Sequence, residues 1–473
     1  MSRLVYRSSR WRLHTRERRT LLLIGDFLVS LPSLVFALYI WAQGDLWFDF
    51  SLDFLRSRPA VWFYFLPIFW IVVLIELYDV RRAEDWRQTL LGVVRAALIG
   101  LVVYMLFYFT APPKSLPRRG FSAFLVTASV LTLLWRWIYI KVFTAPAFMR
   151  RVLVVGAGEL GQKIVQVINE LRPPPFFVVG VLDDDPQKIG KELLGHKILD
   201  SCDRLLEVIE QEDVSDVLVA IGGQMRGRTF QNLLDAQEGG VEIIRMPVMY
   251  EELLGRVPIH HLEADWILRS FVDETRVSGF YLLAKRLVDF AGGLVGLGIL
   301  VIIFPLVGLI TLIESGWPVV FSQTRSGRGG RQYKIFKFRT MHSGAEVDGE
   351  PKLATENDER TTRFGRFLRK THLDEWPQFL NVLSGEMSLV GPRPERPEYV
   401  EKFSQVIPFY RARLLVKPGI AGWAQINFGY AASVEEMATK LEYDLYYIKH
   451  RNLIMDLIIL LRTFGTIFGY RGL

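Results

Sequence analysis

The distribution of apolar residues constrains this chain more than any other feature of its sequence. Each of four long apolar stretches approaches the ~20 residues that a helix needs to cross a hydrocarbon layer of ~30 Å. These stretches are Leu21–Trp41, Val61–Leu77, Leu91–Phe109 and Phe121–Ile140. The mean hydropathy of the whole chain is positive, at +0.22. We therefore predict a membrane protein in which residues 1–148 form a bundle of four spanning helices.

Basic residues around these stretches predict their orientation. Seven arginines between Arg3 and Arg19 precede a run of full spanning length, so we expect a cytoplasmic N-terminus rather than a cleaved signal. The first loop holds three aspartates beside two arginines and the second holds three arginines, as alternation predicts. The third loop does not fit this alternation, because it holds Lys114 and two arginines but would face the outside. Asp26, inside the first stretch, is either a functional intramembrane acid or a helix-packing partner.

Charge and cysteine content limit the function classes. The formal net charge is +7, but the arginine clusters flank apolar stretches, and no basic domain of a nucleic-acid-binding type is apparent. Membrane lipids and phosphate ligands are therefore the predicted partners, and nucleic acid is not. Cys202 is the single cysteine, which excludes an internal disulfide framework and favours a reducing location for the soluble part.

A glycine motif marks the start of a soluble α/β domain, predicted over residues 149–260. The strand Arg151–Val155 leads through this motif into a helix-like run, Gln162–Leu171. The glycines of the GxGxxG motif are Gly156, Gly158 and Gly161. In this context glycines let a pyrophosphate approach the backbone at a helix N-terminus. We therefore predict a Rossmann-like domain.

The ligand of this domain is left open by the sequence. A second strand, Phe177–Leu182, ends at Asp183, where the ribose-binding acid of an NAD(P) site is expected. A third strand, Val217–Ile221, ends at two glycines. The same glycines also fit a degenerate domain in which they only make the tight turn, and which serves dimerisation or regulation. Two hypotheses therefore remain for this domain: it binds NAD(P) or another nucleotide, or it is degenerate and binds none.

An alternative function comes from Tyr281 and Lys285. They spell YxxxK, with Ser270 upstream, as in dehydrogenases and nucleotide-sugar epimerases where the lysine lowers the tyrosine pKa. The motif begins in the predicted linker 261–284, ends at the first residue after it, and directly precedes a long apolar run. An NAD(P)-dependent nucleotide-sugar oxidoreductase or epimerase is therefore a competing hypothesis.

The apolar run Leu287–Ile313 is predicted to enter the membrane and return. Its 27 residues would extend ~40 Å as a straight helix, enough to span. Both flanks are basic, however, and both should then be cytoplasmic. Pro305 removes a backbone donor and bends the helix. A re-entrant hairpin over residues 287–313 reconciles these facts, and a kinked fifth span is the alternative.

The last part of the chain carries clustered charge. Two predicted strands, Val319–Ser322 and Tyr333–Met341, flank a glycine-rich turn whose cations can surround phosphate oxygens. The segment 363–370 combines four cations with apolar residues, as expected of a helix at an anionic interface. The rigid segments 391–397 and 417–423 present further cations between prolines and glycines.

Adjacent carboxylates follow the basic segment. Asp374 and Glu375 suit attack on phosphorus, with one as nucleophile and the other as metal ligand or proton-transfer group. A structural interpretation competes with this one, because Thr371 and Asp374 also have the spacing of a helix capping box.

These motifs occur together in a known family. The chain from about Lys285 to its C-terminus resembles the catalytic domain of the bacterial sugar transferases, which are polyprenyl-phosphate hexose-1-phosphate transferases. The matching segments are KRLVDF (285–290), QTRSGRGG with KFRTM (323–341), LDEWPQFLNVLSGEMSLVGPRPE (373–395) and KPGIAGWAQI (417–426). The apolar stretches and the glycine-motif domain resemble the long, exopolysaccharide-initiating branch, so the likeness covers nearly the whole chain.

The resemblance implies a fold class. It implies a membrane α-helical N-terminal bundle, then a Rossmann-like α/β domain, then an α/β monotopic phosphoglycosyl transferase domain over residues 285–473. The last domain would contain a re-entrant membrane helix broken at Pro305. The protein would lie in the bacterial inner (cytoplasmic) membrane as a multi-pass protein, with this domain on the cytoplasmic face.

The resemblance also implies a reaction and its residues. Asp374 would take hexose 1-phosphate from a UDP-hexose, releasing UMP, and pass it to undecaprenyl phosphate. This would be the first membrane step of exopolysaccharide, O-antigen or capsule synthesis. Glu375 and Asp374 would hold Mg²⁺. The implied phosphate-binding residues are Gln323, Arg325, Lys337, Arg339, Arg393, Arg396 and Lys417.

Some features depart from the family pattern or stay open. Ala421 stands where a threonine is common, and residues 428–430 replace a frequent Gly-Arg, so the identity of the sugar is in doubt. A non-enzymatic scaffold for glycan assembly is a third hypothesis. A homodimer is expected from base rates alone.

Overall fold

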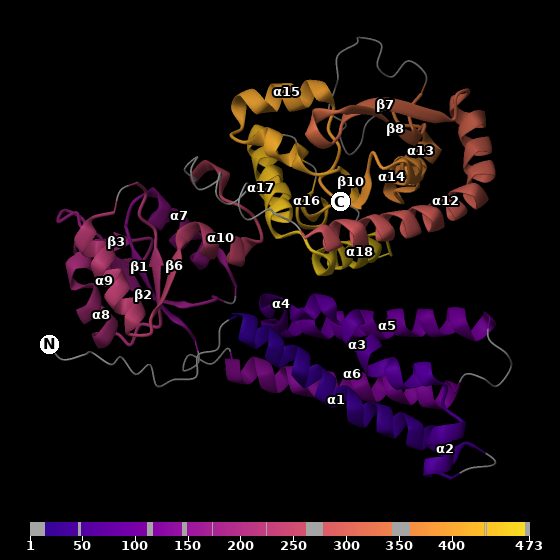
Figure 1. Cartoon of the computed structure of the whole chain (residues 1–473), viewed down its shortest axis with the longest axis horizontal. Helices are drawn as coiled ribbons and strands as arrows, with labels where there is room; N and C mark the ends of the chain where they lie inside the picture. Colours follow the sequence, from indigo (N-terminus) through magenta and orange to yellow (C-terminus); the bar gives the residue numbers. More distant parts are fainter. Residues whose placement is uncertain are drawn as a thin grey trace. The chain divides into compact units, whose positions relative to one another are not determined.

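The computed structural model describes residues 15–45, 49–110, 117–143, 149–172, 174–223, 225–261, 278–342, 360–429, 431 and 433–468. The chain divides into two compact units, Met1–Met246 and Pro247–Leu473. Each unit is described by itself below, with the labels of Figure 1.

Unit 1 begins with long apolar helices. Three of the four predicted stretches lie within single helices that are long and apolar enough to cross a membrane. These helices are α1 (Thr15–Gln43), α5 (Trp86–Thr110) and α6 (Arg118–Phe143). Many of their large apolar side chains are exposed, as expected of helices that face lipid.

The second predicted stretch is helical but divided. It consists of η1 (Val61–Phe65), α3 (Leu66–Val73) and η2 (Ile75–Tyr78). Pro67 lies in the first turn of α3, where a proline is tolerated because the helix leaves that N–H unpaired. The eight residues of α3 extend only ~12 Å as an α-helix, which is shorter than the ~30 Å hydrocarbon layer. Short helices α2 (Leu52–Ser57) and α4 (Val80–Glu84) flank these pieces.

A buried ion pair joins α1 and α6. The Nη2 atom of Arg136 donates to Oδ2 of Asp26 at 2.5 Å, and both side chains are fully buried. The Nη1 atom of Arg136 donates to the carbonyl oxygen of Leu77 at 3.0 Å, so the arginine also holds the divided stretch. Of the two interpretations of Asp26, the structure favours the packing partner.

A parallel sheet forms the α/β domain of unit 1. The strand order is β3-β4-β2-β1-β5-β6, with β3 antiparallel to β4 and the other neighbours parallel. Strands β1 and β2 have the predicted bounds, and β5 starts one residue earlier than predicted and ends two earlier. The strands are β1 (Arg151–Val155), β2 (Phe177–Leu182), β3 (Glu192–Leu193), β4 (His196–Asp200), β5 (Asp216–Val219) and β6 (Glu242–Arg245). The helices are α7 (Glu159–Glu170), η4 (Cys202–Arg204), α8 (Leu205–Gln211) and α9 (Gly227–Glu238).

The glycine motif makes the tight turn from β1 into α7. Gly156 has φ +108°, a conformation that favours glycine. A Cβ atom at Gly161 would overlap the carbonyl oxygen of Gly156, so this glycine allows the helix to pack against the turn. A Cβ atom at Gly158, by contrast, would meet nothing within 4 Å. Two of the three glycines are thus required by the fold itself.

Unit 2 is organised around a two-stranded hairpin and a helical core. The hairpin pairs β7 (Val320–Ser326) with β8 (Gln332–Phe338), and η7 (Arg328–Gly330) forms its turn. Two strands around a glycine-rich turn were predicted, but β7 ends four residues later and β8 three residues earlier than expected. A short parallel pair joins β9 (Ser388–Val390) and β10 (Gly419–Ala421). The remaining elements are α10 (Met246–Leu254), η5 (Ile259–His261), α12 (Gly279–Ser315), α13 (Arg363–Lys370), η8 (Leu373–Gln378), α14 (Phe379–Ser384), α15 (Pro397–Val406), η9 (Tyr410–Leu415), α16 (Trp423–Asn427), α17 (Val434–His450) and α18 (Leu453–Phe468).

Helix α12 contacts the rest of unit 2 along both of its halves. In the first half, Arg286 donates to two carbonyl oxygens of α14, and Asp289 accepts from the Leu389 N–H of β9 at 2.9 Å. In the second half, the Phe304 ring lies 5.5 Å from a phenylalanine ring of β8, and Glu314 accepts from the first turn of α13. The helix contains Pro305 and follows a bent course (Figure 1). Its 37 residues are apolar enough to enter a membrane.

The glycine motif gives a first testable prediction. Gly161→Ala should destabilise the β1–α7 turn by about 1–3 kcal/mol, because the added methyl group overpacks a site with no space. Hydrogen exchange of the amides in β1 and α7 would measure the change. Gly158→Ser is the matched control, since this position has space and serine is a favoured N-cap residue. Equal protection in both variants would contradict the role given to Gly161.

Candidate active site

The predicted carboxylate pair lies at the start of the short helix η8. Helix α13 ends at Thr371, and His372, with φ +54°, turns the chain into η8. The hydroxyl of Thr371 donates back to the carbonyl oxygen of Phe367 at 2.8 Å. The capping box between Thr371 and Asp374 is therefore not formed, because His372 is the N-cap residue of η8 and no side chain caps this helix.

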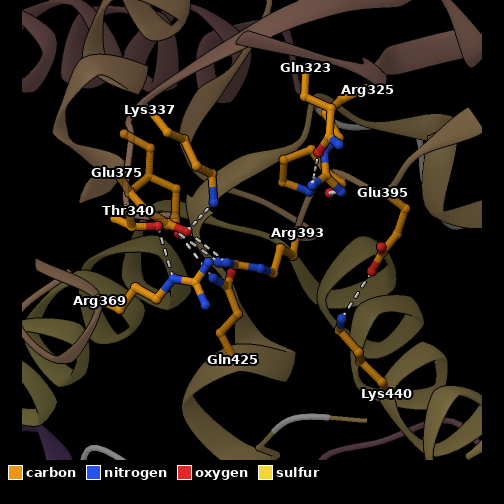
Figure 2. A network of polar contacts seen from close by, with 12 residues as sticks. Gln323, Arg325, Lys337, Thr340, Arg369, Glu375, Arg393, Glu395, Gln425 and Lys440 are labelled. Atoms are coloured by element: carbon orange, nitrogen blue, oxygen red, sulfur yellow. Dashed lines mark hydrogen bonds and ion pairs between the residues drawn. The ribbon is translucent and has the colours of Figure 1, made fainter. Parts of the chain in front are cut away.

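Glu375 is held by two cations. The Nζ atom of Lys337, in β8, lies 2.6 Å from Oε1 of Glu375, and Nη2 of Arg393 lies 2.7 Å from the same oxygen. A second guanidinium nitrogen of Arg393 donates to Oε2 at 3.4 Å. Figure 2 shows these three side chains meeting from separate elements. Burial opposes the charge of Glu375, but Arg393 and Lys337 outweigh it and hold the pKa of this carboxyl well below its usual range.

Asp374 differs from its neighbour. Its side chain is 7% exposed, and no hydrogen bond or ion pair joins it to another of the described residues. Burial, and then the negative charge of Glu375, raise the pKa of Asp374 to about 6. The pair therefore consists of one carboxylate fixed by cations and one whose oxygens remain available. A buried carboxylate of raised pKa that lacks hydrogen-bond donors is suited to act as a nucleophile.

Arg393 reaches Glu375 from a rigid loop after β9. Pro392 and Pro394 flank it and fix the backbone. A Cβ atom at Gly391 would lie 2.4 Å from the carbonyl oxygen of Lys417, so the loop packs directly on the segment before β10. The two proline- and glycine-rich segments of the sequence are thus neighbours in the fold.

Other predicted phosphate-binding residues lie around this loop or farther away. Arg325 donates to the carbonyl oxygen of Pro394 at 3.1 Å and to Oε1 of Gln323 at 2.7 Å. Arg396 is the N-cap residue of α15. The structure does not bring Arg339 or Lys417 to the carboxylates. Arg339 donates to the carbonyl oxygen of Trp317 at 3.2 Å, and Lys417 lies beside Arg286 near Gly385.

Sequence reasoning missed two residues near the pair. Arg369 donates to the hydroxyl of Thr340 at 3.0 Å, and its charge helps to oppose the rise in the pKa of Asp374. Gln425, in the KPGIAGWAQI segment, also lies close to the Glu375–Arg393 pair (Figure 2). The basic segment 363–370 was a signal for Arg369, but its sequence did not show which cation turns inward.

The residues of the oxidoreductase hypothesis have structural partners in unit 2. The Tyr281 hydroxyl donates to Asp456 at 3.0 Å, and Nζ of Lys285 lies 2.9 Å from the same oxygen. Asp456 lies in α18, so this triad joins α12 to α18. Ser270 lies outside the described residues. The YxxxK spacing is therefore explained by helix packing.

The glycine motif of unit 1 has an internal partner for its backbone. The Ala157 N–H donates to Oδ2 of Asp183 at 2.6 Å. The Asp185 N–H binds the other oxygen of Asp183 at 2.9 Å. Asp183 is therefore occupied within the turn. The hypothesis that it binds a ribose stays untested, as does the nucleotide.

The carboxylate pair has oxygens available to bind a magnesium ion. Mg²⁺ is commonly held by one or two carboxylates together with substrate phosphates. Asp374 offers oxygens without hydrogen-bond donors, and Oε2 of Glu375 makes only a long contact at 3.4 Å to Arg393. Within the described ranges, no group of three or more His, Cys, Asp or Glu side chains converges on a metal position. Any such ion would therefore depend on substrate oxygens.

Comparison with known proteins identifies the family. Residues 280–470 match the model of the bacterial sugar transferase family, and residues 73–247 match that of a CoA-binding domain. The first match contains the whole Asp374–Glu375 site. The chain is 43% identical over 320 residues to a UDP-glucose:undecaprenyl-phosphate glucose-1-phosphate transferase of Escherichia coli, covering 66% of this chain and 67% of the relative.

Two further relatives have related names. A UDP-glucose:undecaprenyl-phosphate glucose-1-phosphate transferase of Xanthomonas campestris is 30% identical over 335 residues, 68% of this chain and 67% of the relative. A UDP-N-acetylgalactosamine-undecaprenyl-phosphate N-acetylgalactosaminephosphotransferase of Aeromonas hydrophila is 39% identical over 234 residues, 49% of this chain and 54% of the relative. This chain belongs to the bacterial sugar transferase family, and the predicted transferase class is confirmed.

The pairing of Glu375 gives a second prediction. Glu375→Gln should destabilise the packing of η8 on β8 by roughly 1–3 kcal/mol, because Lys337 and Arg393 lose the carboxylate that neutralises them. Partial exposure of both cations keeps the loss below that of a fully buried pair. Hydrogen exchange in η8 and β8 would measure it. The exposed control Glu401→Gln should stay within about 0.5 kcal/mol, and equal effects would contradict the prediction.

Proposed function

We propose that this protein transfers a hexose 1-phosphate from a UDP-hexose to undecaprenyl phosphate and releases UMP, through a covalent intermediate on Asp374. One observation carries the proposal: a buried carboxylate without hydrogen-bond donors lies beside a second carboxylate that two cations hold. The names of the relatives supply the substrate classes, a UDP-sugar and undecaprenyl phosphate.

The reaction has two displacement steps. In the first, an oxygen of Asp374 attacks the phosphorus that carries the sugar. A P–O bond forms to the carboxylate, the bond to the UMP phosphate breaks, and UMP leaves with the electron pair. In the second, a phosphate oxygen of the lipid attacks the same phosphorus. The bond to Asp374 breaks, which yields a lipid diphosphate sugar and the original carboxylate.

Arg393 and Lys337 provide the positive charge for these steps. They are fixed by Glu375 before any substrate arrives, so their positions need no reorganisation when negative charge develops. Without them, the carboxylate and the donor diphosphate would repel each other in a site that is partly shielded from water. When bound, Mg²⁺ would add charge neutralisation at the donor diphosphate, with Asp374 and Glu375 as its protein ligands.

A re-entrant course of α12 would place this site at the membrane surface. Both halves of the helix contact unit 2, from Arg286 near its start to Glu314 near its end. A helix that crossed the membrane would carry its two ends to opposite sides, whereas both ends here contact the same domain. Exposed apolar residues extend along the same helix and provide a surface for lipid. They include Leu287, Val295, Ile302, Leu306, Leu309 and Ile313.

The membrane location follows from the two substrates. The donor is water-soluble and the acceptor phosphate lies at headgroup depth, so the nucleophile must meet both at the interface. The soluble donor is cytoplasmic, which agrees with the basic flanks of α12. We therefore place the protein in the bacterial inner membrane, at the first membrane step of exopolysaccharide, O-antigen or capsule synthesis.

Replacement of the nucleophile is the direct test of this function. Asp374→Asn should lower UMP release by at least ~10³-fold, because an amide cannot form the intermediate. UMP would be measured with UDP-glucose, UDP-galactose and UDP-N-acetylgalactosamine as donors and undecaprenyl phosphate in detergent. The Glu401→Gln variant, altered at an exposed position, should retain the rate. Undiminished turnover in Asp374→Asn would remove the proposed nucleophile.

The pH dependence follows from the raised pKa of Asp374. The ionised carboxylate attacks, so the rate should fall about tenfold per pH unit as the pH drops below about 6. An aspartate with the ordinary pKa of ~3.9 would keep its rate to about pH 4. Single-turnover UMP release without acceptor separates this effect from ionisation of the lipid phosphate. A flat profile between about pH 4.5 and 7 would contradict the prediction.

The course of α12 can be tested by cysteine labelling. Cys202 is the single cysteine and is buried, so it can be replaced by serine to give a background without thiols. Gly279→Cys and Arg331→Cys then lie on the two sides of the helix, both at exposed positions. A re-entrant helix predicts that an impermeant maleimide labels both only after permeabilisation of spheroplasts. Labelling of Arg331→Cys alone in intact spheroplasts would indicate a spanning helix.

A further inference from the structure

The loop that carries Arg393 is held at every carbonyl oxygen from residue 392 to residue 395. The Gly419 N–H donates to the carbonyl oxygen of Pro392 at 2.9 Å, and the Ser326 N–H donates to the carbonyl oxygen of Glu395 at 2.9 Å. Arg325 donates to the carbonyl oxygen of Pro394 at 3.1 Å. The carbonyl oxygen of Arg393 itself accepts from a side chain, Nη2 of Arg413, at 3.1 Å.

Arg413 reaches this carbonyl from a buried position in η9. Its side chain is 3% exposed. The same Nη2 atom donates to Asp444 of α17 at 2.9 Å, and Nη1 donates to the Tyr410 hydroxyl at 2.7 Å. The guanidinium therefore fastens the backbone of Arg393 to two other elements of the core.

A carboxylate of the loop itself also joins this network. Oε1 of Glu395 lies 3.5 Å from Nη1 of Arg413. The same oxygen lies 3.0 Å from Nζ of Lys440, a contact that Figure 2 shows. Burial opposes the charge of Glu395, but Lys440 and Arg413 outweigh it and lower the pKa of Glu395 to about 2. Glu395 therefore stays charged throughout the neutral range. At Asp444 the effect of burial prevails instead and raises the pKa of that carboxyl above its ordinary value.

We propose that Arg413 is a positioning residue for the transfer reaction, which acts by fixing the backbone of Arg393 so that its guanidinium meets Glu375 beside Asp374. This inference rests on the proposed function. Arg413 itself donates to the main-chain oxygen of Arg393, whereas Glu375 contacts the guanidinium group of Arg393. Its effect on chemistry must therefore pass through Arg393.

The geometry explains why a charge alone is insufficient. Arg413 presents several donors in one plane, and it contacts a carbonyl, a hydroxyl and a carboxylate together. Lysine keeps the charge, but its three N–H donors all leave one nitrogen, which cannot occupy the positions of both Nη1 and Nη2. Arg413→Lys should therefore let the Arg393 loop shift without removing the positive charge.

The test measures UMP release from a UDP-hexose by full-length protein without acceptor. Arg413→Lys should lower the rate roughly 10- to 100-fold, as expected when a catalytic cation is displaced by a fraction of an ångström to about 1 Å. Arg411→Lys, an exposed position on the same helix η9, is the matched control and should retain the rate. Tyr410→Phe removes one partner of Arg413, leaves its contact with Asp444, and should give a smaller loss.

A double-mutant cycle distinguishes positioning from a general structural role. If Arg413 acts through Arg393, Arg393→Lys combined with Arg413→Lys should be no slower than Arg393→Lys alone. The cycle compares single-turnover rate constants at saturating UDP-hexose, so that an effect on the transfer step is separated from an effect on KM. Arg413→Lys should lower this rate constant, and the loss should be absent in the Arg393→Lys background.

Each outcome decides the inference. Losses that multiply in the cycle, or a loss in Arg413→Lys that disappears at saturating UDP-hexose, overturn the positioning role while leaving the proposed function intact. If Arg413→Lys does not fold, as judged by size exclusion and thermal unfolding, Tyr410→Phe enters the same cycle with the same criteria. If the wild-type protein releases no UMP from any UDP-hexose, the proposed function fails and the role of Arg413 fails with it.

Discussion

The pairing of Glu375 with Lys337 and Arg393 is the interaction on which the rest of the site depends. It brings β8, η8 and the loop after β9 to one point, so three segments distant in the sequence share a single centre. Lys337 and Arg393 form their ion pairs with Glu375, and Asp374 has no hydrogen-bond or ion-pair partner among the described residues. The charges of both cations still act on Asp374 and oppose the rise in its pKa. One carboxylate thus fixes the cations, and the other remains able to react.

The supporting structure explains how this centre is kept in place. The hairpin β7–β8 presents Lys337, the parallel pair β9–β10 anchors the two rigid loops, and α12 lies against α14 and β9. Each of these contacts is made by groups within unit 2. The α/β domain of unit 1 has a glycine turn whose backbone already binds Asp183. This hydrogen bond holds the turn without any ligand.

Much of this arrangement could be predicted from local sequence, and the rest could not. The strand–turn–helix pattern around Gly156 predicted β1 and β2 with their observed bounds, because β-branched runs and tight turns are short-range signals. The divided stretch after Val61 was harder, since hydropathy does not register where a helix changes its geometry. The carboxylate pair was found from its motif, but the assignment of Arg369 and Arg413 required long-range packing. The sequence also did not indicate that Arg339 contacts the carbonyl oxygen of Trp317 or that Lys417 lies near Gly385, and phosphate binding by these two residues stays a prediction.

Trapping the covalent intermediate tests the central claim most directly. The full-length protein would be incubated with a UDP-hexose in the absence of undecaprenyl phosphate, quenched with acid and digested for mass spectrometry. The account predicts a hexose phosphate adduct on the peptide that contains Asp374, formed together with one equivalent of UMP. UMP release that needs the lipid acceptor, or an adduct on a different residue, would contradict it.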